Sequence, residues 1–327
     1  MGQTRKTALM KITLVTPASK GSQSGNRVTA VRWGTILRRL GHRVRIVTEY
    51  GGESTDLMVA IHAWRSAESV RLYKASQPDS PLVVLLSGTD IYHFQNEAPA
   101  PTLATMRAAD RLVGLHDRVQ LDIPKAFGDK LHIIYQSCRA PRQARRPTGR
   151  GFQVCVVGHL RDEKDPLRAA YAARLMPTDS RLRVVHLGAP HTPGWADLAR
   201  EEAANNPRYE WRGSLPAWQV RGFYARCHAM VMSSVMEGGA NVVTEAIVAD
   251  LPVIASDISG NRGLLGEAHA AYFPAGDEHA LAALLARAEG DPDYLESMAT
   301  AAAALKPQLT QESELCAWHE LIDGLRS

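Results

Sequence analysis

The chain has 327 residues, more than a single hydrophobic core usually supports, so we expect two domains. Hydrophobic residues make up 45% and charged residues 22% of the chain, as in soluble globular proteins, and no run approaches the ~20 apolar residues that span a bilayer. The net charge of +4 suits a small anionic ligand, whereas the lack of a dense Lys/Arg run with interleaved aromatic residues argues against a nucleic-acid partner.

Two features of the sequence concern the cellular compartment. Residues 1–9 contain two basic residues but no apolar core, so we do not expect them to act as a secretory signal. The four cysteines show no C-x-x-C spacing, which favours reduced thiols over a structural zinc site. These features predict a cytoplasmic protein without stable membrane association.

In the first half of the chain, short apolar runs alternate with longer amphipathic stretches. A strand is predicted over residues 11–16, followed by a helix over 25–40 that Gly41 ends. Further strands are predicted over residues 43–48, 56–61, 81–86, 111–114 and 131–134. This alternation predicts a first domain, residues 10–140, with a parallel sheet and helices on both faces.

A basic segment rich in Pro and Gly interrupts the alternation at residues 139–150. We interpret it as a solvated linker, with a membrane-surface role as the weaker alternative. Its arginines are Arg139, Arg142, Arg145, Arg146 and Arg150.

The same alternation then restarts and predicts a second domain over residues 151–305. Strands are expected over residues 152–157, 182–187, 208–211, 229–232 and 252–255, and helices over 166–175, 216–226, 241–249 and 281–289. Asp165 is expected to cap the first of these helices, with Pro166 at its first position. The chain is therefore predicted to be an α/β protein of two doubly wound, Rossmann-like domains, with ligand at the carboxyl ends of the strands.

The first candidate site follows the first strand of the second domain and has the sequence GHLRDEKD, beginning at Gly158. Arg161 and Lys164 lie three residues apart there, so that a planar guanidinium and a compact ammonium could straddle a diphosphate. The alternative is a surface loop in which these charges pair with Asp162 and Glu163. The position at a strand end favours the phosphate site.

The second candidate is the segment EGGANVVTE, which follows a strand and opens a helix. Gly238 and Gly239 would let backbone N–H groups approach an anion at the helix start. Asn241 and Glu245 lie one turn apart on one helix face, where a carboxylate could accept hydrogen bonds from ribose hydroxyls. Glu237 could meet sugar hydroxyls. A simple N-cap with an exposed glutamate is the alternative, and it does not explain two glycines between two carboxylates.

Metal binding has little support in the sequence. Asp291-Pro292-Asp293 has the D-x-D spacing of metal-dependent GT-A glycosyltransferases, but it precedes an amphipathic helix, and helix capping explains it better. The twelve histidines include no H-E-x-x-H motif. We therefore expect neither a metal nor a cofactor, so that Arg161, Lys164 and helix N-termini would neutralise a leaving diphosphate.

These motifs resemble those of glycosyltransferase family four. The two glutamates separated by seven residues precede an apolar strand, as in that family, and residues 158–164 resemble its G-R-L-x-x-x-K segment with His159 in place of the usual Arg. The resemblance implies a GT-B fold, with two domains facing across a cleft. By resemblance, Glu245 binds ribose and Glu237 the donor sugar.

The same resemblance implies roles for further residues. Arg161 and Lys164 would bind the diphosphate, and the terminal residues 306–327 would form a helix that crosses back to the first domain. Residues implied in donor binding are Gly158, the turn Gly213-Ser214-Leu215 that would hold the base, and the turn Gly238-Gly239-Ala240-Asn241.

Four patches of the first domain narrow the resemblance to the selenosugar synthases of selenoneine biosynthesis. They are TLVTP, GSQSGNR, HAWRSA and SGTD, beginning at residues 13, 21, 62 and 87. The resemblance spans most of residues 10–327. It implies transfer of N-acetylglucosamine or glucose from a UDP-sugar to the selenium of selenophosphate. A family-four enzyme acting on a glycan or lipid-linked acceptor is one alternative, and a non-catalytic nucleotide-sugar-binding protein is another.

The residues of these patches suit a small anionic acceptor. Gly25, Asn26 and Arg27 end a glycine-bounded loop that leads into a helix, where they could hold an oxyanion, although a flexible connection capped by Asn26 is equally consistent. At a strand end, Thr89 could donate to a phosphate oxygen and Asp90 could touch a sugar hydroxyl, or Asp90 could merely cap the next turn. His62 is interpreted as a packed histidine rather than a base.

Overall fold

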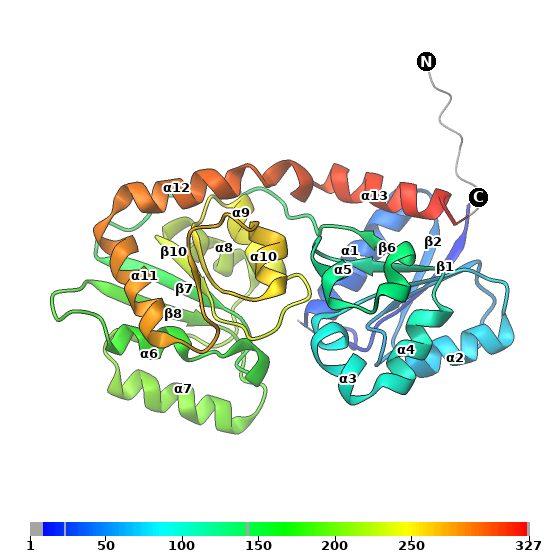
Figure 1. Cartoon of the computed structure of the whole chain (residues 1–327), viewed down its shortest axis with the longest axis horizontal. Coiled ribbons are helices and arrows are strands. Elements are labelled where there is room, and N and C mark those ends of the chain that lie inside the picture. Colours follow the sequence, from blue (N-terminus) through cyan, green and yellow to red (C-terminus); the bar gives the residue numbers. More distant parts are fainter. Residues whose placement is uncertain (1–8, 23, 142–143, 326–327) are drawn as a thin grey trace, which may run out of the picture. The chain divides into compact units, whose positions relative to one another are not determined.

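The computed structural model describes residues 9–22, 24–141 and 144–325, and every structural statement below concerns these residues. The N-terminal residues 1–8, on which the expectation about secretion depends, and Arg142 of the basic segment lie outside them. The chain divides into two compact units, labelled by element in Figure 1. Unit 1 comprises Met1–Gln136 and Gln311–Ser327, and unit 2 comprises Ser137–Thr310.

Unit 1 is built on a six-stranded, fully parallel sheet with the order β2-β1-β3-β4-β5-β6. The strands are β1 (Lys11–Val15), β2 (Arg43–Val47), β3 (Leu57–Ile61), β4 (Leu82–Leu85), β5 (Arg111–Gly114) and β6 (Leu131–Ile133). The chain goes from β1 to β2 on one side and then returns to β3 on the other. This reversal is a topological switch point, the place where open α/β sheets bind ligands.

Unit 2 repeats this design with the order β12-β11-β10-β7-β8-β9, again fully parallel. Its strands are β7 (Phe152–Val157), β8 (Leu182–Leu187), β9 (Tyr209–Trp211), β10 (Ala229–Met232), β11 (Val253–Ser256) and β12 (Tyr272–Phe273). The order reverses between β7 and β10, which places the switch point of unit 2 at the ends of these two strands.

Helices accompany each sheet. Those of unit 1 are α1 (Gly25–Arg39), α2 (Ala67–Ser76), α3 (Gln95–Glu97), α4 (Pro99–Ala108), α5 (Val119–Asp122) and α13 (Gln311–Asp323). Those of unit 2 are α6 (Arg168–Arg174), α7 (Pro193–Asn205), α8 (Ala217–Arg226), α9 (Asn241–Val248), α10 (Ser259–Leu265), α11 (Glu278–Gly290) and α12 (Pro292–Ala303). Short π and 3₁₀ turns lie at Asp90–Phe94, Lys125–Lys130, Asp162–Lys164 and Lys306–Leu309.

The C-terminal helix α13 packs on α1 within unit 1 (Figure 1). The buried rings of Trp33 and Trp318 meet edge to face at 4.7 Å, and Trp33 Nε1 donates a hydrogen bond of 2.9 Å to Glu314 Oε1. Burial of two tryptophans and a paired carboxylate makes α13 part of the core of unit 1.

The predicted start of one helix is wrong, and the alternative in which Asn26 acts as a cap is excluded. Helix α6 begins at Arg168 and not at residue 166, because a 3₁₀ turn over Asp162–Lys164 intervenes and leaves Asp165 in the left-handed region with φ = 42°. The Asp165 carboxylate accepts from Arg168 at 2.7 Å instead of capping α6. Helix α1 is capped by Ser24, whose hydroxyl accepts from the Arg27 N–H at 3.4 Å, and not by Asn26.

The prediction for Asp291 is confirmed. Its side chain accepts from the Tyr294 N–H at 3.0 Å and caps α12, with Pro292 in the first turn. The D-x-D spacing is thus accounted for by helix capping.

In the part of the chain that the structure describes, no helix combines the length and apolar character that a membrane span needs.

Candidate nucleotide-sugar site

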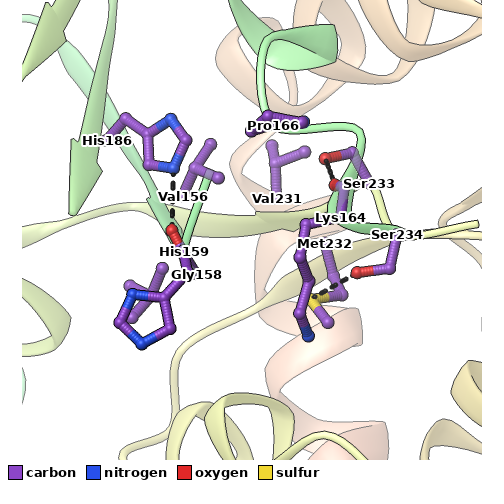
Figure 2. A pocket seen from close by; sticks show the side chains of 11 residues that line it. Val156, Gly158, His159, Lys164, Pro166, His186, Val231, Met232, Ser233 and Ser234 are labelled. Carbon is purple, nitrogen blue, oxygen red and sulfur yellow. Dashed lines mark hydrogen bonds between the residues drawn. The ribbon is translucent and has the colours of Figure 1, made fainter. Parts of the chain in front are cut away.

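A pocket opens at the switch point of unit 2, between the ends of β7 and β10 (Figure 2). The pocket is small, with an empty volume of about 220 Å³ that includes space open to solvent. It therefore suits one part of a larger ligand. The lining residues are Val156, Val157, Gly158, His159, Lys164, Pro166, His186, Val231, Met232, Ser233 and Ser234.

An ion pair lies at this pocket. Lys164 Nζ contacts Glu237 Oε1, and the Ser234 hydroxyl donates to the same oxygen at 2.6 Å. The side chains of Lys164 and Glu237 are only 17% and 10% exposed, so each charge is largely desolvated and depends on the other. None of the described residues donates a hydrogen bond to Glu237 Oε2. The pair thus combines a fixed cation with a carboxylate oxygen that can accept from a ligand hydroxyl.

Hydrogen bonds join the loop after β10 to the turn that carries Lys164. The Ser233 hydroxyl bonds the carbonyl oxygens of Lys164 at 3.1 Å and Asp165 at 2.9 Å, and the Val235 N–H donates to the Glu163 carbonyl at 3.0 Å. These bonds fix the backbone on both sides of Lys164. The sequence prediction did not include Ser233 or Ser234, although their position directly after a buried strand was an available signal.

A buried hydrogen-bond chain supports the loop of Glu237 from behind. Asn261 Nδ2 donates to the Ser256 carbonyl at 2.9 Å, and the Ser256 hydroxyl donates to the Ser234 carbonyl at 2.5 Å. Asn261 and Ser256 are fully buried. Gly260 adds a steric constraint, because a Cβ atom there would lie 2.0 Å from the Glu237 carbonyl oxygen.

Gly158 is held by a buried histidine. Burial lowers the pKa of His186 to about 4, so the ring is neutral at physiological pH. The Gly158 carbonyl can only accept, so His186 Nε2 carries the proton donated to it at 3.1 Å, while Nδ1 accepts from the Tyr209 hydroxyl at 3.0 Å. The backbone of Gly188 also packs directly against Gly158, because a Cβ atom at residue 188 would lie 1.8 Å from the Gly158 carbonyl oxygen.

The turn before α9 has the geometry of an anion site. Gly239 has φ = 121°, which disfavours any residue with a Cβ. Ala240 at the N-cap position provides no side-chain hydrogen bond to the start of α9. Asn241 and Glu245 follow one turn apart, as predicted.

Glu245 is oriented by a buried tyrosine that the sequence prediction missed. The Tyr224 hydroxyl donates to Glu245 Oε2 at 2.9 Å. Burial, followed by the charge of Glu245, raises the pKa of Tyr224 well above its ordinary value, so the phenol stays a donor. This contact orients the carboxylate that was predicted to bind ribose.

Arg161 and the predicted base-binding turn lie outside the pocket lining. Arg161 Nε is 3.7 Å from Glu163 Oε2, the pairing expected of the surface-loop alternative, yet Nε has no hydrogen-bond partner among the described residues. Gly213 has φ = 65°, and its carbonyl accepts from the Gly188 N–H at 2.8 Å. Ser214 and Leu215 follow Gly213 directly in the chain.

The candidate acceptor residues meet at the carboxyl edge of the sheet in unit 1. Asp90 is 1% exposed, and its carboxylate accepts from the N–H groups of Ala63, Trp64 and Ser87 at 2.8–2.9 Å. It also contacts His62 Nδ1 at 2.6 Å. With both oxygens engaged, Asp90 fits a supporting role better than contact with a sugar hydroxyl.

The other acceptor candidates lie around this pair. The Thr89 hydroxyl is 3.0 Å from His62 Nε2, and the Ser87 hydroxyl donates to Asn26 Oδ1 at 3.5 Å. Gly25 opens α1, and Arg27 follows in its first turn. His62 is buried, but it bonds polar partners on both ring nitrogens, which the sequence interpretation had not assigned to it.

Among the described residues, no three His, Cys, Asp or Glu side chains are grouped so that they could hold a metal ion.

The fold and this arrangement of strand ends define a glycosyltransferase of GT-B architecture. The chain belongs to the family described as "Glycosyl transferases group 1", whose sequence profile matches residues 140–305. The matched residues contain the Lys164–Glu237 pair and helix α9.

Solved glycosyltransferase structures share the fold of the whole chain. HepE from Anabaena, solved in complex with UDP and glucose, has a TM-score of 0.74 and 15% identity, covering 97% of this chain and 99% of its own. Sucrose-phosphate synthase from Thermosynechococcus elongatus has a TM-score of 0.75 at 14% identity, with coverage of 96% and 98%. The lipopolysaccharide outer core galactosyltransferase WaaB gives 0.70 at 14%, with coverage of 96% and 99%. The predicted fold class is thereby confirmed.

Proposed function

We propose that the protein transfers N-acetylglucosamine or glucose from a UDP-sugar to the selenium of selenophosphate, in the cytoplasm and without a metal or cofactor. The use of a UDP-sugar donor is supported by one observation, the Lys164–Glu237 pair at the switch point of unit 2. Close to it in sequence, Glu245 of α9 accepts a hydrogen bond from Tyr224 of α8. HepE, which shares the fold, was solved with UDP and glucose. The acceptor half rests on the four sequence patches and their clustering in unit 1.

In this proposal the donor lies along the strand ends of unit 2. Glu245 accepts hydrogen bonds from the ribose, the Gly213–Leu215 turn faces the base, and Glu237 accepts from a sugar hydroxyl. Lys164 and the N–H groups at the start of α9 neutralise the diphosphate, because fixed donors stabilise developing charge without reorganisation. Arg161 adds a fork of donors from the neighbouring loop.

The reaction forms a bond from the anomeric carbon to selenium and breaks the bond from that carbon to UDP. Asn26 and Arg27 hold the phosphate oxygens of the acceptor, which Thr89 also contacts. Water then attacks phosphorus and breaks the Se–P bond, which releases phosphate and the selenosugar. These side chains position the acceptor for attack. Positioning supplies a large part of catalysis when the nucleophile, here selenium, is already reactive.

One observation favours a second candidate, transfer to a lipid-linked or glycan acceptor. Such an enzyme is expected to present an amphipathic basic face in its first domain, and α1 exposes Val28 and Val31 at 42% and 47%. Arg38 and Arg39 are exposed further along the same helix. A face of this kind suits an anionic membrane surface.

Mass spectrometry of the reaction products tests the choice between the two. Purified protein is incubated with UDP-N-acetylglucosamine or UDP-glucose, with selenophosphate, a lipid-linked acceptor or no acceptor. The proposal predicts a sugar with the selenium isotope pattern, together with UDP and phosphate. No selenium-containing product with either donor, combined with transfer to the lipid-linked acceptor, would exclude it in favour of the second candidate.

Two variants test which residues bind the UDP-sugar donor and which bind the acceptor. Glu245→Ala is expected to weaken UDP-sugar binding, whereas Arg27→Ala is expected mainly to raise the KM for selenophosphate. Calorimetric titration of UDP and steady-state kinetics with varied acceptor separate these effects. Unchanged acceptor kinetics in Arg27→Ala would show that the acceptor has been placed wrongly.

A further inference from the structure

A buried histidine, a carboxylate and a half-buried threonine form a hydrogen-bonded row in unit 1, outside the donor site. His62 directly follows β3, and Thr89 and Asp90 lie beyond the end of β4. Because β3 adjoins β1 at the switch point of this sheet, the row lies at the edge where α/β sheets bind ligands.

The backbone at His62 is strained. Its φ is 78°, in the left-handed region that residues other than glycine seldom occupy. The ring is 2% exposed and packs at 5.7 Å from Phe94, whose own ring stacks on Trp64 at 3.9 Å. Strained residues of this kind persist where the surroundings overdetermine them, and they cluster at functional sites.

The contacts determine the direction of the hydrogen bonds. Asp90 Oδ1 lies 2.6 Å from His62 Nδ1, and an ionised carboxylate can only accept, so Nδ1 carries the proton. The Arg65 N–H also points at Nδ1, but at 3.3 Å this is the weaker contact. His62 Nε2 is then an acceptor, and the Thr89 hydroxyl donates to it at 3.0 Å.

In this arrangement the hydroxyl oxygen of Thr89 still has lone pairs that can accept a proton. Its own proton points at the basic nitrogen His62 Nε2. The N–H groups of Ala63, Trp64 and Ser87 donate to the Asp90 carboxylate, which in turn lies 2.6 Å from His62 Nδ1, where it can stabilise a positive charge on the ring. Thr89 is half-buried, whereas His62 and Asp90 are enclosed. A ligand that hydrogen-bonds the threonine hydroxyl is thereby linked to the imidazole.

We infer that Thr89, His62 and Asp90 form a proton relay that takes the proton of the acceptor during glycosyl transfer. As the anomeric carbon bonds to the acceptor atom and UDP leaves with the electron pair, the acceptor's proton passes to Thr89 Oγ. The original proton of Thr89 moves to His62 Nε2, and the imidazolium is stabilised by Asp90. Solvent later removes the proton, so charge balances without a further reactant.

The inference rests on the proposed function for the identity of the acceptor, although any acceptor that loses one proton fits it. Selenophosphate that carries a proton, a hydroxyl group and water all meet this condition. Thr89 is the residue in contact with the acceptor, and His62 acts through it.

The test compares Thr89→Val, which keeps the shape but removes the hydroxyl, with Thr89→Ser, which retains it. His62→Asn is included because asparagine tolerates the left-handed backbone, and the double variant His62→Asn/Thr89→Val completes the cycle. Thr105→Val is the matched control, because the Thr105 hydroxyl bonds the Pro101 carbonyl within α4, away from His62 and Asp90 in the hydrogen bonds of the described residues. Each variant is assayed for kcat, for the KM of selenophosphate, for UDP affinity and for hydrolysis of the UDP-sugar.

The relay predicts that Thr89→Val and His62→Asn each lower kcat by about 10²-fold, with no further loss in the double variant. Thr89→Ser restores most of kcat, and UDP affinity and Thr105→Val remain as in the wild type. If folded Thr89→Val keeps the wild-type kcat, or if the two losses multiply, the relay is overturned.

Failure of the proposed function gives a different result. If the wild type makes no selenosugar but hydrolyses the UDP-sugar, the proposed acceptor is wrong and the relay is judged on hydrolysis, with the same expected losses. If the wild type shows neither reaction, both the relay and the proposed function are contradicted.

Discussion

Lys164 and Glu237 lie 73 positions apart in the sequence. Even so, the Lys164 ammonium and the Ser234 hydroxyl both contact the same carboxylate oxygen of Glu237. Each side chain is mostly buried, so the charge of one is tolerable only beside the charge of the other. The same two charges are what a nucleotide sugar requires: a cation for the diphosphate and an acceptor for a sugar hydroxyl. Stability and ligand recognition thus depend on the same pair.

Glu237→Gln tests this dependence. The substitution keeps the shape of the side chain but leaves Lys164 without its counter-charge, so we expect kcat/KM to fall by about 10²-fold and the melting temperature to drop. The matched control is Glu202→Gln, which disrupts the pair between the buried Glu202 and the half-exposed Arg174 in the same unit. It is expected to lower the melting temperature without changing kcat/KM. Equal kinetic losses in both variants would refute a specific role for Glu237.

The hydroxyl of Tyr224 has a narrower role, the orientation of Glu245. Tyr224→Phe removes only this donor, so we expect UDP affinity to fall by about tenfold, corresponding to roughly 1.4 kcal/mol for one hydrogen bond to a charged group. Tyr294→Phe removes a comparable bond, to the Ala270 carbonyl at 3.0 Å, and serves as the control. Calorimetry with UDP measures both. An affinity unchanged in Tyr224→Phe would show that Glu245 needs no such support.

At the scale of elements, the loop of Glu237 is supported by the start of α10. Gly260 lies so close to the Glu237 carbonyl that Gly260→Ala must displace one of the two backbones. We expect at least about a tenfold loss of UDP-sugar affinity. Gly222→Ala in α8 is the control, because a Cβ there meets nothing within 4 Å. Retained affinity in Gly260→Ala would mean that the loop position does not set the site.

The strands were largely predictable from the sequence, because a buried parallel strand appears as a short apolar run bounded by turn residues. Strands β7, β8 and β10 have the predicted bounds. The start of α6 was not predictable, because the 3₁₀ turn before it depends on bonds from Ser233 and Val235, about 70 residues away. Tertiary contacts thus override a favourable local cap.

The same division holds for the candidate site. Glycines and charged residues after a strand mark the ligand edge, so Gly158, Lys164, Glu237 and Glu245 could be found from the sequence. His186 and Asn261 could not be found in this way. The sequence of a strand or of a helix start does not show which backbone carbonyl a polar side chain bonds. His62 was undervalued because its partners follow a different strand.

At the scale of the whole molecule, each unit contains a buried histidine that must stay neutral. Burial lowers the pKa values of His116 in unit 1 and His186 in unit 2 to about 4, below the ordinary value of 6.5. The unfolded chain therefore binds more protons as the pH falls below about 6.5, and stability is lost between that pH and about 4. Each histidine is expected to cost about 2 kcal/mol of unfolding free energy between pH 7 and pH 5.

Urea unfolding at the two pH values checks this prediction. His116→Leu is expected to reduce the pH dependence, because neither ring nitrogen of His116 has a hydrogen-bond partner among the described residues. His191→Leu, at an exposed position, should leave it unchanged. A wild-type protein equally stable at pH 5 and pH 7 would contradict the account of both histidines.

The most direct test of the central claim is selenium-77 NMR of the product made from selenophosphate and a UDP-sugar labelled with carbon-13 at the anomeric carbon. The account predicts a selenium resonance split by one-bond coupling to the labelled carbon, which appears with UDP and is absent without enzyme. Recovery of the label only in free sugar or in an oxygen-linked glycoside, with no coupling to selenium, would contradict it.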